Sequence, residues 1–141
     1  MKAFVKSLEK FGRTHREILA LYLFGSQATG TSGPLSDLDI AILVDEKKVK
    51  HRGLFSLHLN LLTLLMERCQ RSDLDLVLLN EATPLLAYEV TRTGRLLYER
   101  DHDGRVEFEA RAVQHYLDLE PFYRVGRAYL KHQLLAQGKR G

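Results

Sequence analysis

The chain has 141 residues, with 21 Lys and Arg against 18 Asp and Glu, and a formal net charge of +3. This length allows one domain with a core, excludes a second acceptor-binding domain, and carries too little positive charge to indicate a direct nucleic-acid partner. The single cysteine, Cys69, excludes an internal disulfide and suits a reducing compartment. Because no apolar run reaches about 18 residues and the first residues do not resemble a leader, we expect a soluble, cytoplasmic protein with no membrane partner.

The first predicted elements are a helix ending near Arg13 and a buried strand over residues 21–24. Gly25 and Ser26 follow the strand at its carboxyl end. Glycine lets the backbone approach a phosphate closely, and a serine hydroxyl with neighbouring N–H groups can hold phosphate oxygens. Ligands of open α/β sheets bind at the carboxyl ends of strands, so Gly25 and Ser26 are candidate nucleotide-binding residues.

Two acidic residues, Asp37 and Asp39, open the aliphatic run 38–44, which predicts a second strand. Residues two apart on a strand point to the same face, so these carboxylates repel each other unless a cation neutralises them. Mg²⁺ prefers carboxylate oxygens and keeps positions open for substrate phosphates. We therefore predict a magnesium site, the alternative being an ordinary Gly-Ser turn beside two solvated carboxylates.

A third carboxylate is expected on the next strand. After a core-facing helix over about residues 51–70, the segment 72–80 is apolar and begins with Asp73 and Asp75. Asp75 is the better candidate because it lies inside the apolar run, where a charge without a partner is costly. Both residues share one face of a strand, so Asp73 stays open as the alternative.

The following segment predicts a helix over residues 84–93, with Thr83 as its N-cap and a proline in its first turn. A short strand over residues 95–98 comes next. The only segments that resemble linkers are 45–50 and 100–105, both short and charged.

The last part of the chain is helical in pattern, and Pro121 predicts either a new helix or a kink over about residues 121–136. Residues 126–141 contain basic side chains and no acid. This end either packs on its own domain or forms an interface with a partner or a second copy. We therefore divide the chain into a core, residues 1–104, and a C-terminal helical extension of the same domain, residues 105–141, which is a candidate partner-binding tail.

Five short segments together resemble a known family: FGSQATG at 24–30, SDLDIA at 36–41, DLV at 75–77, LNEA at 79–82 and GRLLYE at 94–99. They are similar to the minimal nucleotidyltransferases (MNT), small members of the DNA polymerase β-like nucleotidyltransferase superfamily found as antitoxins of HEPN/MNT toxin–antitoxin pairs. The resemblance implies an α/β fold of the polymerase β-like type, a small mixed sheet flanked by helices and followed by C-terminal helices.

The resemblance also implies a function. A type VII-like antitoxin of this family acts as a protein adenylyltransferase that transfers AMP from ATP to a tyrosine hydroxyl of a cognate HEPN ribonuclease toxin, its partner in a hetero-oligomer. We expect Asp37, Asp39 and Asp75 to be catalytic and to hold two Mg²⁺ ions, and Gly25 and Ser26 to position the phosphates of ATP. The alternatives are a non-catalytic antitoxin that neutralises its toxin by binding, and a nucleotidyltransferase for a small molecule such as an aminoglycoside.

Overall fold

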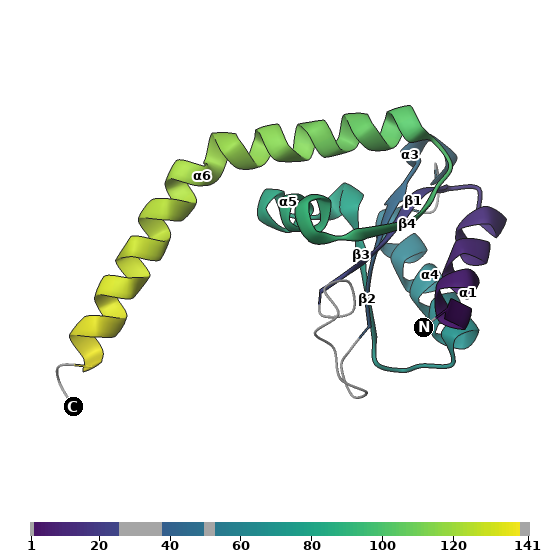
Figure 1. The fold of residues 1–141 in the computed structure, drawn as a ribbon, viewed down its shortest axis with the longest axis horizontal. Coiled ribbons are helices and arrows are strands. Elements are labelled where there is room, and N and C mark those ends of the chain that lie inside the picture. Colours follow the sequence, from purple (N-terminus) through teal and green to yellow (C-terminus); the bar gives the residue numbers. More distant parts are fainter. Residues whose placement is uncertain (1, 26–37, 50–52, 139–141) are drawn as a thin grey trace.

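The computed structural model describes residues 2–25, 38–49 and 53–138 of the chain, built around a four-stranded sheet (Figure 1). The strand order is β3-β2-β1-β4. β2 and β3 are parallel, whereas β1 is antiparallel to both β2 and β4. The expected small mixed sheet is therefore confirmed. The strands are β1 (Ile18–Phe24), β2 (Leu38–Val44), β3 (Leu74–Leu78) and β4 (Arg95–Glu99).

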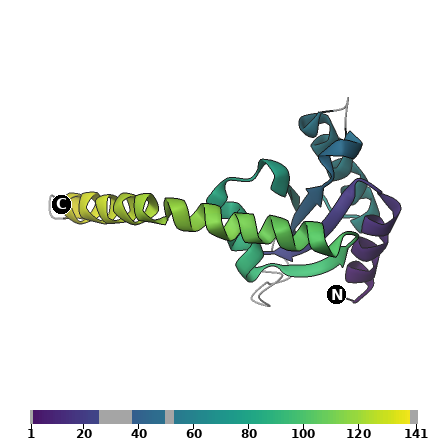
Figure 2. The same cartoon turned by 90° about the horizontal axis from the view of Figure 1, so that it is seen from above.

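Helices cover both faces of the sheet. α1 and α4 contact one face, and α5 and the first part of α6 contact the other, as Figures 1 and 2 show from two directions. Among the described helices, none combines the length and the apolar character needed to cross a membrane. The helices are α1 (Lys2–Thr14), α3 (Glu46–Val49), α4 (Leu54–Cys69), α5 (Pro84–Thr93) and α6 (His102–Gly138), with a 3₁₀ turn, η1 (Leu79–Glu81).

The core is divided between the two faces of the sheet because successive strand residues point to opposite sides. In β2, Leu38 and Ile40 belong to the larger apolar cluster, which includes buried residues of α1 and α4. Ala41 and Leu43 belong to the smaller cluster, which includes Val90 of α5. The odd-numbered residues of β2 therefore face α5 and α6, and this alternation decides on which side the acidic residues lie.

Local signals set the ends of α5 as predicted. The Thr83 hydroxyl accepts a hydrogen bond from the backbone N–H of Leu86 at 3.2 Å, and Pro84 occupies the first turn. At the other end, the N–H of Gly94 donates to the carbonyl of Val90 at 2.8 Å. These bonds satisfy backbone groups that a helix leaves unpaired at its ends, so the sequence determines α5 locally.

Both segments expected as linkers contain helix, which corrects that prediction. Residues 46–49 form α3, and α6 begins at His102, three residues before the extension expected from residue 105. Beyond this point one helix continues to Gly138 with Pro121 inside it. Figure 1 shows α6 bending partway along its length. Proline is the usual cause of such a bend, because its ring clashes with the preceding turn, so of the two alternatives the chain adopts the kink.

Candidate active site

The end of β1 lies beside an aspartate of β2. Phe24 and Asp39 are paired residues of the two antiparallel strands, and Gly25 follows with a φ of 72°. A Cβ atom at Gly25 would overlap Oδ2 of Asp39. Glycine is therefore required here for two reasons: it adopts a left-handed conformation at low cost, and it leaves room for the Asp39 carboxylate against the backbone. The sequence indicated a glycine for phosphate approach, but only the structure shows that it accommodates Asp39.

Two of the predicted carboxylates lie side by side. Asp39 and Asp75 are paired residues of the parallel strands β2 and β3, so their side chains leave the same face of the sheet from positions about 4.8 Å apart. Each alternates with buried leucine or isoleucine on the opposite face, Asp39 being half-buried and Asp75 exposed. The pairing brings together residues that are 36 positions apart in the chain, at the edge of the sheet where β1 ends.

The alternative third carboxylate, Asp73, has a different environment. Its two oxygens accept hydrogen bonds from Nε and Nη2 of Arg71 at 2.9 and 2.6 Å. The Arg71 guanidinium holds the pKa of the Asp73 carboxyl below its ordinary value by these bonds. The Asp73 carbonyl also accepts a hydrogen bond from the N–H of Leu38 at 3.0 Å. Asp73 therefore joins the starts of two strands, and this contact supports the choice of Asp75 over Asp73 as a site residue.

Ser26 and Asp37, the other two predicted site residues, lie outside the described residues. Within the described ranges, no group of three His, Cys, Asp or Glu side chains is arranged to hold a metal ion. The donors that do meet there, Asp39 and Asp75, are both carboxylates. A purely oxygen donor set fits Mg²⁺ and does not resemble the nitrogen and sulfur ligands of a structural zinc site.

A cavity of about 610 Å³ lies at the opposite end of the same face. Leu43, Phe108 and Arg111 are among its lining residues, which include neither Asp39 nor Asp75. Because Leu43 lies four residues along β2 from Asp39, roughly 13 Å separates this cavity from the acidic edge. The cavity and the candidate active site are therefore different places on the sheet.

Sequence reasoning gave no structural role to Asn80, although it lies in the LNEA segment. The structure shows its side chain bonded to both backbone groups of Val44. Oδ1 of Asn80 accepts from the Val44 N–H, and Nδ2 donates to the Val44 carbonyl, both at 2.9 Å. The amide thus acts as one more residue of a strand beside the end of β2. It fixes where β3 ends relative to β2, and through that register it helps to hold Asp75 opposite Asp39.

Residues 6–103 match the model of the family described as Polymerase beta, Nucleotidyltransferase. The chain belongs to this family, which implies a nucleotide substrate, and the family and fold predicted from the sequence are confirmed. It is similar to the protein adenylyltransferase MntA of Aphanizomenon flos-aquae, at 33% identity over 97 residues, 66% of this chain. The matched part spans about 65% of the length of that curated relative.

Two solved structures share the fold. A chain of a crystal structure of a toxin–antitoxin with AMP-PNP has a TM-score of 0.73 at 24% identity, covering 90% of this chain and 98% of the other. A chain from the complex of tri-AMPylated Shewanella oneidensis HEPN toxin with MNT antitoxin has a TM-score of 0.69 at 21% identity, covering 92% and 98%. Both matches cover at least 90% of this chain.

Proposed function

We propose that this chain is an antitoxin of the MNT type and a protein adenylyltransferase, transferring AMP from ATP to a tyrosine hydroxyl of a cognate HEPN ribonuclease toxin. One observation carries the proposal: Asp39 and Asp75 stand in register on neighbouring strands, directly beside the Gly25 turn. The name of the MntA relative, and the AMPylated toxin in the Shewanella complex, supply the acceptor class. A cytoplasmic location fits such a pair, because a ribonuclease toxin acts where cellular RNA is found.

In the proposed reaction, the tyrosine oxygen attacks the α-phosphorus of ATP. A new phosphorus–oxygen bond forms to the tyrosine, the bond from the α-phosphorus to the bridging oxygen breaks, and pyrophosphate leaves. The tyrosine proton passes to a carboxylate, for which Asp75 is the candidate because it is the more exposed of the two described aspartates. Gly25 and Ser26 are proposed to position the β- and γ-phosphates.

Asp37, Asp39 and Asp75 are proposed to hold two Mg²⁺ ions. When bound, these ions would neutralise the triphosphate charge and lower the pKa of the acceptor hydroxyl. The half-buried carboxylate of Asp39, next to a second carboxylate, is the kind of site that a divalent cation stabilises. Asp37 lies outside the described residues and is kept in the proposed set because the sequence predicts that it shares a strand face with Asp39.

The test combines the purified protein, α-³²P-labelled ATP, Mg²⁺ and the product of the adjacent reading frame. We expect label on that product with the wild type and none with Asp39→Asn, since the substitution keeps the shape of the side chain and removes its charge. Asp73→Asn is the matched control, because it removes a nearby carboxylate, just before β3, that is bonded to Arg71.

The other outcomes separate the alternatives. A tight complex without label would show a non-catalytic antitoxin that neutralises its toxin by binding. Label on an aminoglycoside and not on the neighbouring protein would show a small-molecule enzyme. Full labelling by Asp39→Asn would overturn the assignment of the site itself.

A further inference from the structure

The second half of α6 leaves the body of the protein. Figures 1 and 2 show from two directions that the helix continues away from the sheet and that the end of α6 lies far from the other elements. The last packed residue is Tyr123, whose ring stacks on Tyr116 at 5.8 Å, and Tyr116 stacks on Tyr88 of α5 at 3.9 Å. Every residue from 124 to 137 is exposed. We call residues 122–138 the arm, a helical segment about 25 Å long.

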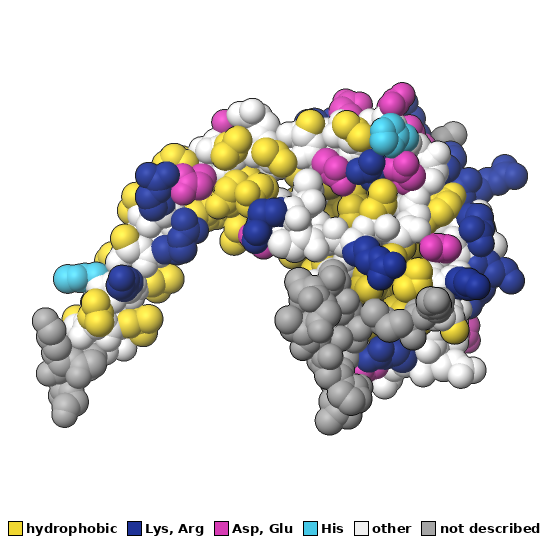
Figure 3. All heavy atoms as spheres, in the orientation of Figure 1, with side chains coloured by type: hydrophobic (Ala, Val, Ile, Leu, Met, Phe, Trp, Pro, Cys, Tyr) yellow, Lys and Arg dark blue, Asp and Glu magenta, His cyan; other side chains and the backbone are white. Residues whose placement is uncertain are grey.

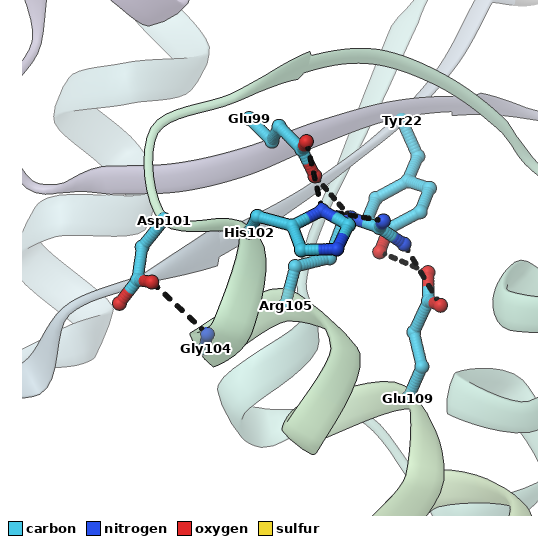
Figure 4. A network of polar contacts seen from close by, with 7 residues as sticks. All are labelled: Tyr22, Glu99, Asp101, His102, Gly104, Arg105 and Glu109. Atoms are coloured by element: carbon cyan, nitrogen blue, oxygen red, sulfur yellow. Dashed lines mark hydrogen bonds and ion pairs between the residues drawn. The ribbon is translucent and has the colours of Figure 1, made fainter.

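The base of α6 is fixed to the sheet, so the direction of the arm is set by the fold. Arg105 forms ion pairs with Glu99 of β4 and, at 2.9 Å, with Glu109 one turn further along the helix. Glu109 also accepts a hydrogen bond of 2.6 Å from the hydroxyl of Tyr22 in β1. Figure 4 shows these side chains converging between the first turns of α6 and the strands. The helix is thus bonded to two strands before it reaches α5.

The arm exposes an unusual amount of apolar surface. Of the twelve large hydrophobic residues that are exposed among the described ones, half lie in the arm. At 100° per residue they are spread over roughly 260° of the helix circumference, and Figure 3 shows apolar side chains along this segment. A helical segment of this length gains little stability in water without packing. The six residues are Phe122, Val125, Tyr129, Leu130, Leu134 and Leu135.

The arm is also the basic part of the protein. Residues 122–141 contain five Lys and Arg and no acid, whereas the rest of the chain carries 16 basic and 18 acidic residues. Arg124, Arg127 and Lys131 are three or four residues apart and therefore lie together along one side of the helix, in the strip of roughly 100° that the apolar residues leave. Arg124 and Arg127 also pair with Glu120 of the preceding turn, at 2.6 and 3.8 Å. A surface that encloses the apolar side brings its rim close to this basic strip, so an acidic rim complements the cations.

We propose that the arm docks in an apolar groove between helices of the HEPN toxin, with acidic residues on the rim of the groove, and so holds the toxin while it receives AMP. The inference rests on the proposed function for the identity of the partner. An apolar surface that extends around most of the helix fits a groove better than a flat surface. Six such side chains bury on the order of 700 Å², close to the roughly 800 Å² per partner of a stable interface.

A second copy of this chain is a poorer occupant. Two arms, each with three cations and no acid, repel each other when they pair. Outside α6, the exposed large hydrophobic residues of the described part are four, and they are spread over three elements: Phe55 and Leu59 of α4, Leu85 of α5 and Leu96 of β4. These four residues do not form an apolar groove of the length of the arm.

The test compares two double variants with matched exposure. Phe122 and Leu130 in the arm are 72% and 61% exposed, and Phe55 and Leu59 in α4 are 74% and 51% exposed. We change each pair to Gln, which retains helix propensity. For the arm variant we expect KM for the toxin to rise at least tenfold with kcat at saturating toxin unchanged, and for the α4 variant neither constant to change. Calorimetric binding in an Asp39→Asn background, which blocks transfer, should show the same weakening of affinity.

A second variant keeps the apolar residues and reverses the charge at Arg127 and Lys131 to Glu. It should also weaken toxin binding, and it should reduce the dependence of affinity on salt. If both arm variants have normal KM and normal affinity for the toxin, the docking proposal is wrong, and the proposed AMP transfer is unaffected. Toxin binding that needs the arm, without transfer by the wild type, would instead refute the proposed reaction alone. If the wild type without toxin has the solution mass of a dimer and the arm variants have that of a monomer, the arm binds a second copy. If the arm variants bind toxin normally but no longer sediment with phosphatidylglycerol vesicles, the arm binds a membrane.

Discussion

Replacing Gly25 with alanine tests the geometry of the candidate active site directly. The added Cβ would overlap Oδ2 of Asp39, and the φ of 72° would be strained for any residue with a side chain. Gly53 provides a matched control, because its φ is 74° and a Cβ there would meet no atom within 4 Å. The two substitutions share the backbone strain, and only the first displaces the carboxylate.

The expected magnitudes follow from these contacts. The left-handed conformation costs a residue with a Cβ about 1–2 kcal/mol, so both variants should lose stability by a similar amount, a fall in Tm of roughly 3–6 °C for a domain of this size. To reach normal van der Waals separation from the new Cβ, the Asp39 oxygen has to move by roughly 1 Å. A misplacement of about 1 Å in a catalytic constellation costs on the order of 100-fold in rate.

The assay measures thermal unfolding of both variants and their initial rates of AMP transfer at saturating ATP. We expect Gly25→Ala to lose about 100-fold in kcat and Gly53→Ala to stay within about twofold of the wild type. If Gly25→Ala transfers AMP as fast as Gly53→Ala, the position of the Asp39 carboxylate against the β1 backbone does not matter for the reaction, and the reasoning is wrong.

Three further predictions concern the surroundings of the site. Asp75→Asn should reduce transfer by at least about 1000-fold and Asp73→Asn by less than about threefold, as measured by initial rates; equal losses would refute the choice between them. Asn80→Ala removes two hydrogen bonds to the backbone of β2 and should cost about 2 kcal/mol in the free energy of unfolding, measured by urea titration; a loss below about 0.5 kcal/mol would show that the amide does not fix the strand end. A hydrogen bond from Arg105 lowers the pKa of Glu99 from its ordinary 4.5, so this contact stabilises the protein above that pH and is lost as the pH falls through the lower folded value. Glu99→Gln should therefore lower Tm at pH 7 and flatten its fall below pH 4.5, and an unchanged acid profile would exclude this contribution.

Much of the fold follows from local patterns in the sequence. The strand over residues 38–44 has the bounds that the sequence predicts, because a short, largely aliphatic run favours a buried strand. The helix α5 was equally predictable, since its N-cap, first-turn proline and terminal glycine lie within twelve residues. The start of α6 was not predicted, although Asp101 caps it by accepting a hydrogen bond from the Gly104 N–H at 3.1 Å, because residues 100–105 are short and charged and resemble a linker.

For the candidate site, the sequence determined the chemistry and the tertiary structure decided the arrangement. Residue types and spacing were enough to indicate carboxylates, a glycine turn and a cation. The pairing of Asp39 with Asp75 depends on the parallel register of two strands separated by a whole helix, and the spacing of residues along the chain does not encode such a register. The projection of the arm is likewise a tertiary property: the same apolar pattern would suit a helix packed on its own domain, and only the anchoring of α6 to β1, β4 and α5 directs the arm away from it.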